Sequence, residues 1–257
     1  MLTSQFAVYP TLRKRIVIIS GGATGIGGAM VEAFANQGAQ VVILDILTKA
    51  ACQLIEKLEK AGVTYPPIFM HCDVTDIEGD VKSVSASLLE LYPQIDVLIN
   101  NAANDKRQKS GDITLDLWEK GLATNLRHHF FITQALLPAF SETSSVINMG
   151  SVAWATPLTD MAPYVVSKSA IVGLTKTLAH ELGLRGIRVN SIMPGAIATE
   201  RQKRDIITPE YEKSLLERQA LKRILKPSDV SNLALWLSAA DGSGMTGQSI
   251  VIDGGWL

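Results

Sequence analysis

Cysteine and histidine are scarce in this sequence. It has two cysteines and four histidines among 257 residues. Cys52 and Cys72 have neither a third partner nor a CxxC spacing, so we predict free thiols, as in a reducing cytoplasm. The histidines lack the spacing of metal ligands. We therefore expect no metal site, and we assign surface or interface positions to the adjacent His128 and His129.

An excess of one charge and a long hydrophobic run are also missing. The formal net charge is -1, and no basic stripe indicates nucleic-acid binding. No apolar run approaches the roughly 20 residues that span a membrane. Residues 1–14 have no cationic start followed by an apolar stretch, so they do not resemble a secretory signal, and we interpret them as a short mobile extension. We expect a cytoplasmic protein that binds neither nucleic acid nor membranes.

The rest of the chain, residues 15–257, predicts one α/β domain. Short runs rich in β-branched residues alternate with amphipathic stretches, and runs such as 41–44 are apolar on both faces. This pattern is typical of a Rossmann-type, doubly wound parallel sheet of about seven strands with helices on both faces. Strands are predicted at 15–20, 40–45, 67–72, 95–99, 145–149, 187–192 and 249–252, and helices at 26–37, 49–61, 77–91, 115–140, 162–184 and 228–239.

One segment breaks this alternation. Residues 195–226 are charged and only weakly helical, with a helical pattern at 208–219. A stretch of this length between two regular elements is typical of a substrate lid.

A glycine-rich turn follows the first predicted strand and opens a helix. Glycines let the backbone approach a pyrophosphate closely, and a helix N-terminus offers N–H groups to it. The spacing is Gly-x-x-x-Gly-x-Gly. The predicted cofactor contacts of this turn are Gly21, Thr24, Gly25, Ile26 and Gly27.

Two acidic residues at strand ends extend this nucleotide site. Asp45 ends the second strand, where a carboxylate accepts hydrogen bonds from an adenosine ribose but repels a 2′-phosphate. We therefore predict NAD rather than NADP. Asp73 and Val74 follow the third strand and suit an adenine ring. Each aspartate also has an ordinary interpretation, Asp45 as a strand-end cap and Asp73 as a turn residue.

The pattern Tyr-x-x-x-Lys at Tyr164 and Lys168 points to proton transfer. Residues four apart share one face of a helix, so the phenol and the ammonium stand side by side. We expect Lys168 to lower the pKa of Tyr164 from about 10 towards neutral pH, which makes the phenolate a usable base. Ser151, thirteen residues upstream of Tyr164, is placed to hydrogen-bond the oxygen that gains or loses the proton.

Taken together, these motifs resemble the short-chain dehydrogenase/reductase family. They occur in the order and spacing of that family from residue 15 onward, with Ser20, Ala103 and Gly150 as departures from its usual residues. The matching residues are Gly21, Gly25, Gly27, Asp73, Val74, Asn100, Asn101, Ala102, Asn125, Ser151, Tyr164, Lys168, Pro194, Gly195, Ile197 and Thr199.

The resemblance implies roles for these residues. Tyr164 is the implied catalytic acid/base, Ser151 polarises the substrate oxygen, and Lys168 holds the nicotinamide ribose. Asn125 is implied to support a water that connects Lys168 to solvent. Ile197 and Thr199 are implied to contact the nicotinamide carboxamide, and Asn101, Ala102 and Pro194 complete the implied cofactor site. The family also implies a homotetramer.

Three stretches resemble the sugar-oxidising members of this family, which convert aldoses to lactones: residues 100–105, 150–154 and 253–256. A polyol needs several donors and acceptors and an aromatic face. The substrate contacts that we expect, besides Ser151 and Tyr164, are Asn104, Asp105, Arg107 and Trp154. The same polar stretch is also compatible with a solvated loop.

The function predicted from the sequence is NAD-dependent oxidation of a sugar, most simply at C1 of an aldose, with Tyr164 as general base. One alternative within the family is an enzyme whose substrate is another secondary alcohol or ketone. Such a substrate could be a sugar acid bound by Arg201 and Arg204 of the lid. A different alternative is a non-catalytic NAD-binding sensor on the same fold. The presence of Asn125, Ser151, Tyr164 and Lys168 argues against the sensor.

Overall fold

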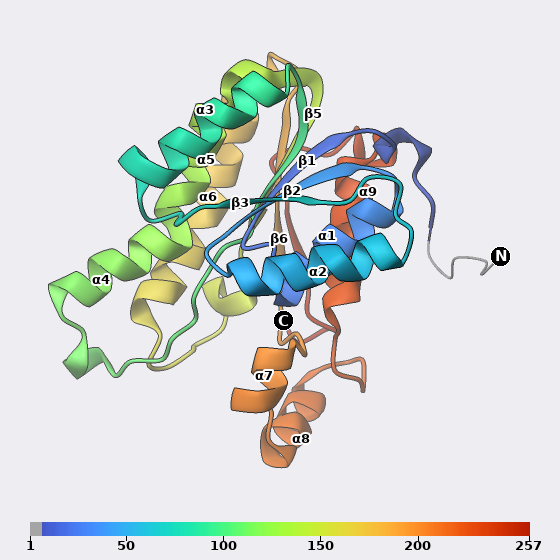
Figure 1. Ribbon diagram of the computed structural model, residues 1–257. Helices are drawn as coiled ribbons and strands as arrows, with labels where there is room; N and C mark the ends of the chain where they lie inside the picture. Colours follow the sequence, from blue (N-terminus) through green and yellow to red (C-terminus); the bar gives the residue numbers. More distant parts are fainter. Residues whose placement is uncertain (1–6) are drawn as a thin grey trace.

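A seven-stranded parallel sheet forms the centre of the molecule (Figure 1), and the computed structural model describes residues 7–257. The strand order is β3-β2-β1-β4-β5-β6-β7, and every pairing is parallel. This is the doubly wound sheet that the sequence predicted. The strands are β1 (Ile16–Ser20), β2 (Gln40–Asp45), β3 (Ile68–His71), β4 (Ile95–Asn100), β5 (Phe140–Met149), β6 (Arg188–Pro194) and β7 (Ser249–Ile252).

Helices cover both faces of the sheet (Figure 1). On one face lie α1 (Gly25–Asn36), α2 (Thr48–Lys60) and α9 (Pro227–Ser238). On the other lie α3 (Lys82–Leu91), α5 (His128–Leu136) and α6 (Ala162–Gly183), with α4 (Leu115–Leu122) packed against α6. The central strands contribute side chains to the cores on both faces of the sheet. In β1, Val17 and Ile19 belong to one buried cluster, and Ile18 between them belongs to the other.

Two predicted helices are interrupted, which corrects the sequence interpretation. The stretch 115–140 divides into α4, a π-helical turn η4 (Ala123–Arg127), α5 and a 3-10 turn (Leu137–Ala139). A single π turn keeps a helical backbone and has no sequence signature of its own, so the sequence pattern does not distinguish it from an α-helix. Pro138 provides no backbone N–H, and β5 already begins at Phe140 rather than at Ser145. A second π turn (Ile77–Val81) precedes α3.

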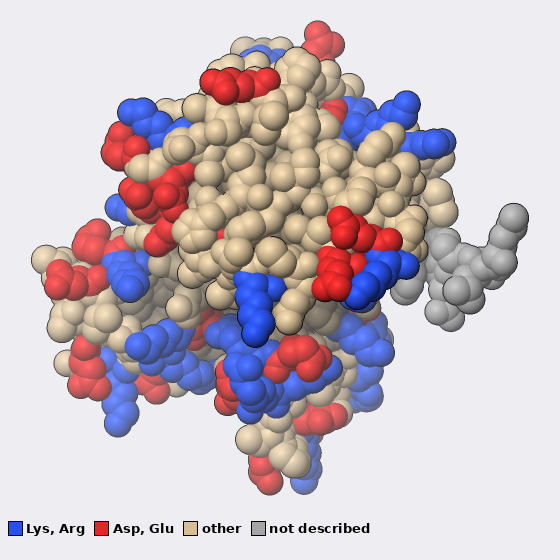
Figure 2. Space-filling view, viewed as in Figure 1, with Lys and Arg blue, Asp and Glu red and all other residues tan. Residues whose placement is uncertain are grey.

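The lid segment contains two short helices at the carboxyl ends of the strands, α7 (Glu200–Asp205) and α8 (Pro209–Arg218). Threonine hydroxyls cap both: Thr199 accepts from the backbone N–H of Gln202, and Thr208 accepts from that of Tyr211. Charged side chains of both signs, lysine and arginine as well as aspartate and glutamate, gather in this region of the surface (Figure 2).

Residues 7–14 are anchored to the body of the protein at a few points, and the predicted mobility of the extension stays a prediction; residues 1–6 lie outside the described residues. Leu12 is fully buried in the core cluster under α1 and α9. The backbone N–H of Tyr9 donates to the side chain of Gln37, and the hydroxyl of Thr11 accepts from the N–H of Ala240.

Both cysteines are free thiols, Cys52 exposed and Cys72 buried, as predicted. Within residues 7–257, no helix is long and apolar enough to cross a membrane. The same part of the chain holds no group of three or more acidic, histidine or cysteine side chains suited to a metal ion.

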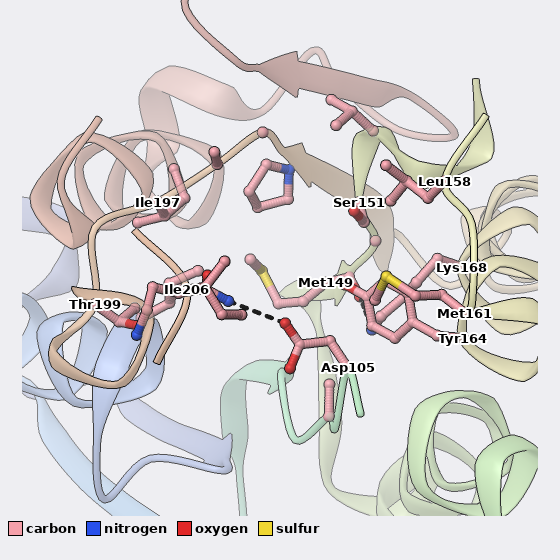
Figure 3. A pocket seen from close by; sticks show the side chains of 18 of the residues that line it. Asp105, Met149, Ser151, Leu158, Met161, Tyr164, Lys168, Ile197, Thr199 and Ile206 are labelled. Atoms are coloured by element: carbon pink, nitrogen blue, oxygen red, sulfur yellow. Dashed lines mark hydrogen bonds between the residues drawn. The ribbon is translucent and has the colours of Figure 1, made fainter. Parts of the chain in front are cut away.

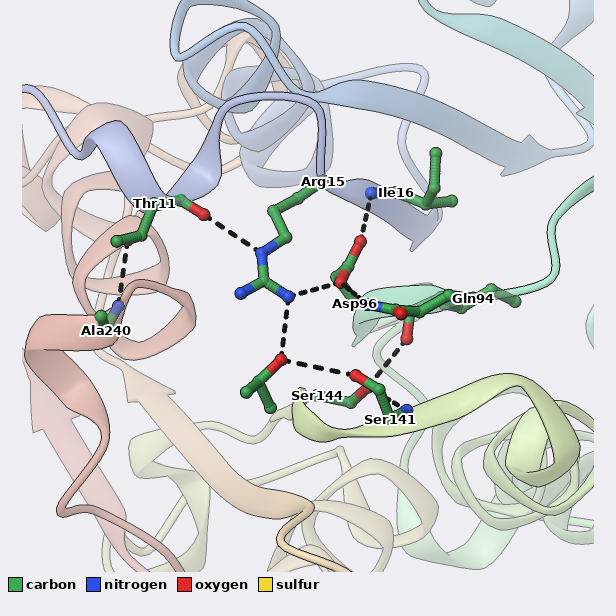
Figure 4. A network of polar contacts seen from close by, with 10 residues as sticks. Thr11, Arg15, Ile16, Gln94, Asp96, Ser141, Ser144 and Ala240 are labelled. Atoms are coloured by element: carbon green, nitrogen blue, oxygen red, sulfur yellow. Dashed lines mark hydrogen bonds and ion pairs between the residues drawn. The ribbon is translucent and has the colours of Figure 1, made fainter.

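A polar network fixes the amino-terminal edge of β1 to that of β4 (Figure 4). Asp96 accepts hydrogen bonds from the Arg15 guanidinium at 2.5 Å, from the backbone N–H of Ile16 at 2.8 Å and from the Gln94 amide at 2.6 Å. Its side chain is 7% exposed. Removing a buried carboxylate leaves its donors without a partner, which costs more than the hydrogen bonds themselves contribute.

We predict that Asp96→Ala lowers the stability by about 2–3 kcal/mol, or roughly 5–10 °C in Tm. Lys60→Ala is the control, because it breaks the ion pair with Glu56 in which the two side chains are 73% and 62% exposed. Exposed pairs contribute little, so this variant keeps the wild-type Tm. Calorimetry of both variants checks the prediction, and an equal Tm for the two would contradict it.

Candidate active site

A cavity of about 220 Å³ opens at the carboxyl ends of the strands. Its walls come from the glycine-rich turn, the segments that follow β4, β5 and β6, the start of α6, the lid and the C-terminus (Figure 3). The position next to β1 and β4 is the point where the strand order reverses. Open α/β sheets bind ligands at this point.

The glycines of the turn are required by close backbone approaches. Gly21 has φ +64°, and a Cβ there would lie 2.7 Å from the Cα of Ala102. A Cβ on Gly27 would lie 1.9 Å from the carbonyl oxygen of Gly21. The turn is held to the segment after β4 by the Asn101 amide, which donates to the carbonyls of Ser20 at 3.0 Å and Gly21 at 2.9 Å.

The two acidic residues of the predicted nucleotide site are found at strand ends. Asp45 is 8% exposed and accepts from the N–H groups of Ala23 at 2.9 Å and Leu47 at 3.0 Å. It therefore fixes the glycine-rich turn as well as ending β2. Asp73 accepts from the N–H and hydroxyl of Thr75, which gives it the ordinary role of a turn residue. Contact of either residue with a nucleotide stays a prediction.

Ser151, Tyr164 and Lys168 all line the cavity (Figure 3). Ser151 follows β5, and Tyr164 and Lys168 are one turn apart on α6. The Lys168 ammonium lies 5.7 Å from the centroid of the Tyr164 ring and donates to the carbonyl of Met149 at 2.7 Å. The chain thus brings together, from two elements, a hydroxyl, a phenol and an amine.

Burial controls the protonation of this site. It raises the pKa of Tyr164 to about 12, and the Asp105 carboxylate adds to this rise, whereas the Ser151 hydroxyl lowers the pKa. Burial also lowers the pKa of Lys168 to about 7. In the protein alone the pKa of Tyr164 therefore lies above its usual value rather than towards neutral pH, and the contribution of Lys168 stays a prediction. Desolvation disfavours both charges, and the amine is directed to a carbonyl.

Asn125 lies in the π-helical turn η4 and is 2% exposed. Its amide nitrogen donates to the carbonyl of Gly121 at 2.9 Å, and its amide oxygen accepts from the N–H of Asn104 at 2.8 Å. Both ends of the side chain are therefore used to shape the site. The predicted link through a water stays a prediction.

The predicted substrate residues divide into two groups. Asp105 and Arg107 line the cavity, whereas Asn104 and Trp154 do not, and Trp154 is 44% exposed. The Asn104 side chain instead accepts from the N–H of Lys106. The lid reaches across the cavity to Asp105, which accepts from the Arg201 guanidinium and from the Gln202 amide, the latter at 3.0 Å.

Further lining residues come from the lid and from the C-terminus. Pro194 at the end of β6 and Ile197 and Thr199 after it, which were predicted to contact the cofactor, line the cavity. Gln202 and Tyr211 were missed, because nothing in a charged helical pattern indicates which face covers a pocket. Trp256, directly after the Gly254–Gly255 turn, supplies an aromatic wall.

His128 and His129 are fully buried, so the prediction of surface or interface positions is wrong. Burial lowers the pKa of His128 to about 3 and holds that of His129 well below its usual range. Both rings are therefore neutral near pH 7. A sequence signal was available: they stand in the apolar stretch that packs α5 on β4.

The departures from the family pattern also have a place in the structure. A Cβ on Gly150 would lie 2.0 Å from the sulfur of Met193, so this methionine fills the space that a serine side chain needs. Ser20 serves the turn, because its hydroxyl accepts from the N–H groups of Asn101 at 3.0 Å and Ala102 at 3.2 Å.

The doubly wound sheet, the glycine-rich turn at its switch point and the Ser–Tyr–Lys site define a dinucleotide-dependent oxidoreductase. A family model described as enoyl-(acyl carrier protein) reductase matches residues 21–257. A D-xylose 1-dehydrogenase of Caulobacter vibrioides is 40% identical over 252 residues, which are 97% of this chain and 98% of that protein. A probable galactose dehydrogenase, GalD, of Rhizobium meliloti is 39% identical over 256 residues, 99% of each chain.

Among solved structures, a putative gluconate dehydrogenase from Agrobacterium tumefaciens superposes with a TM-score of 0.89 at 28% identity, covering 97% of this chain and 98% of that one. The chain belongs to the short-chain dehydrogenase/reductase family.

We predict that Gly27→Ala weakens NADH binding at least tenfold, because the new Cβ collides with a backbone oxygen and displaces the turn. Gly28→Ala is the matched control, since its Cβ would lie at an ordinary 3.5 Å from the nearest atom. Fluorescence titration with NADH gives both affinities. Equal affinities in the two variants would contradict the account of the turn.

Proposed function

We propose that the protein is an NAD-dependent aldose 1-dehydrogenase, which oxidises the C1 hydroxyl of an aldose to a lactone. The observation that carries this proposal is a half-buried Tyr164, next to Ser151, in a cavity whose other walls present Asp105, Arg107 and Gln202. A sugar ring needs several donors and acceptors of this kind. The names of the Caulobacter and Rhizobium relatives support the same substrate class.

NAD is the cofactor that we propose, because Asp45 ends β2 beside the glycine-rich turn. A carboxylate there favours a ribose with free hydroxyls and disfavours a 2′-phosphate. Thr24, the residue before α1, carries no charge that offsets it. Bound NAD+ supplies a hydride acceptor and a positive charge over the catalytic residues.

The chain's own residues supply position and proton handling. Ser151 accepts or donates a hydrogen bond at the substrate oxygen and holds it next to the phenol of Tyr164. Tyr164, as phenolate, removes the hydroxyl proton while the C–H bond at C1 breaks. Lys168 on the same helix face stabilises the phenolate when it carries its proton. Pro194, Ile197 and Thr199 enclose the cofactor side of the cavity.

A sugar acid is the second candidate substrate. Arg107 and Arg201 both line the cavity, and a guanidinium binds a carboxylate in a bidentate way. The likeness to a putative gluconate dehydrogenase points in the same direction. However, Arg201 already pairs with Asp105, which favours a neutral sugar.

Residues 195–226 act as the lid in this proposal, since α7 contacts Asp105 across the cavity. A homotetramer and a cytoplasmic location complete it. The exposed apolar side chains of Leu115, Phe130 and Val166 on α4, α5 and α6 support assembly with other subunits.

Tyr164→Phe tests the proposal. We expect a loss of aldose oxidation of at least 1,000-fold, because the general base is removed, with NADH affinity kept within about threefold. NADH formation is followed with NAD+ or NADP+ and a panel of aldoses, sugar acids and polyols. Turnover of sugar acids but not of aldoses would show that the substrate is a sugar acid rather than an aldose. An active Tyr164→Phe variant would contradict the role of Tyr164 as general base.

The pH profile tests the role of Ser151. Oxidation needs the deprotonated phenol, so kcat/KM rises with pH through the apparent pKa of the coupled Tyr164–Lys168 pair. Because the Ser151 hydroxyl lowers the pKa of Tyr164, Ser151→Ala moves this rise to higher pH and lowers the rate about 100-fold. Val152→Ala, a change at the neighbouring residue, is expected to leave the profile in place. An unchanged profile in Ser151→Ala would contradict this electrostatic role.

A further inference from the structure

Residues 100–104, at the end of β4 and directly after it, are hydrogen-bonded to residues 125–129 at every second position. The Asn100 amide donates to the carbonyl of His129 at 3.2 Å. The carbonyl of Ala102 lies 3.0 Å from Nε2 of His128. The N–H of Asn104 donates to the Asn125 side chain at 2.8 Å. These three bonds form one seam that joins the segment to η4 and to the start of α5.

The same segment is also bonded to the cofactor turn. The N–H groups of Asn101 and Ala102 donate to the Ser20 hydroxyl, and the Asn101 amide donates to the carbonyls of Ser20 and Gly21. The segment then continues to Ala103 and Asp105, which line the cavity. Its position therefore sets both the floor beside the glycine-rich turn and the wall that faces the lid.

The bond from His128 is the middle one of the seam and fixes a tautomer. A carbonyl oxygen only accepts, so Nε2 must carry the proton and donate to Ala102. Within the described part of the chain, Nδ1 has no hydrogen-bond partner of good geometry. An unprotonated nitrogen tolerates this position better than an N–H group does, because it leaves no donor without a partner.

The surroundings keep the ring in this form. Burial lowers the pKa of His128 to about 3, and the charge of Lys168 contributes, which together outweigh the carbonyls of Ala102 and Thr124 that favour a charged ring. The His129 ring packs against it at a tilt of 48°, with ring centroids 4.4 Å apart, and is directed to Asn148 instead. The neighbouring ring thus limits the movement of His128 without contacting the segment after β4 through its own nitrogens.

We infer that His128 is a positioning residue of the active site: its Nε2–H holds the Ala102 carbonyl and so places residues 101–105 for the cofactor and the sugar. This inference deepens the proposed function. Only the statement that His128 places the segment for the sugar rests on that proposal. Ser151 follows β5, and Tyr164 and Lys168 lie on α6, so all three are outside this segment. Loss of the bond therefore affects binding more than the chemical step.

The first test compares four variants of the full-length enzyme. His128→Leu removes the donor, His128→Asn offers one that ends too close to the backbone to replace Nε2, and His128→Gln extends an amide nitrogen to about the position of Nε2. His129→Leu is the matched control, because this ring is equally buried at the next position. Tm, the Kd of NADH and the steady-state kinetics with the best aldose are measured for each.

We expect His128→Leu and His128→Asn to raise the aldose KM and the NADH Kd about tenfold, the value of one lost hydrogen bond, with kcat kept within about threefold. His128→Gln restores both constants to within about threefold of wild type. His129→Leu lowers the Tm but leaves both constants in place. Equal effects of the two leucine variants, or no rescue by glutamine, would show that His128 serves stability only and would overturn the inference.

The second test needs neither a stable leucine variant nor a known sugar. The ¹⁵N spectrum of the histidine side chains in the wild-type enzyme, with His128 assigned by its absence in His128→Gln, reports which ring nitrogen carries the proton. We expect a neutral ring protonated at Nε2 across about pH 6 to 8. A ring protonated at Nδ1, or a charged ring, would overturn the inference. If no aldose is oxidised, the proposed substrate fails, whereas the NADH affinities and this spectrum still decide the role of His128.

Discussion

The close approach of the turn after β1 to the segment after β4 is the constraint on which the site depends. At the switch point of the sheet these two stretches lie so near that a Cβ on Gly21 would be 2.7 Å from the backbone of Ala102. The side chains of Ser20 and Asn101 each form hydrogen bonds to the backbone of the other stretch and so hold the two stretches together. The glycine-rich turn, the cofactor floor and the wall that holds Asp105 are therefore parts of one bonded unit rather than independent loops.

Burial is the second physical factor, and it shifts the pKa values of the phenol and the amine in opposite directions. It raises the pKa of Tyr164 to about 12 and lowers that of Lys168 to about 7, so near pH 7 the protein alone keeps Tyr164 uncharged and leaves Lys168 about half protonated. A positive charge near the phenol favours the phenolate. The Ser151 hydroxyl lowers the pKa of Tyr164 within the protein itself, and bound NAD+ would add a positive charge. Binding and proton transfer are thereby coupled.

Much of this arrangement could be predicted from the sequence, because it depends on local patterns. The apolar runs on both faces of the strands indicated a parallel sheet, and the spacing of Ser151, Tyr164 and Lys168 indicated one site, which lies at the carboxyl end of β5 and the start of α6. Other features depend on non-local packing. The π turn that carries Asn125 has no sequence signature of its own, and the pairing of Asp105 with Arg201 joins residues 96 positions apart. The burial of His128 and the rise of the Tyr164 pKa by desolvation likewise follow from the three-dimensional surroundings.

The central claim is that hydride leaves C1 of an aldose in this cavity, and isotope transfer tests it most directly. The enzyme is incubated with NAD+ and with D-xylose or D-galactose that carries deuterium at C1, and the products are analysed by NMR. The account predicts that the deuterium appears in the reduced nicotinamide, together with the sugar lactone or its hydrolysis product. Reduced cofactor without deuterium, or a product oxidised at another carbon, would contradict it.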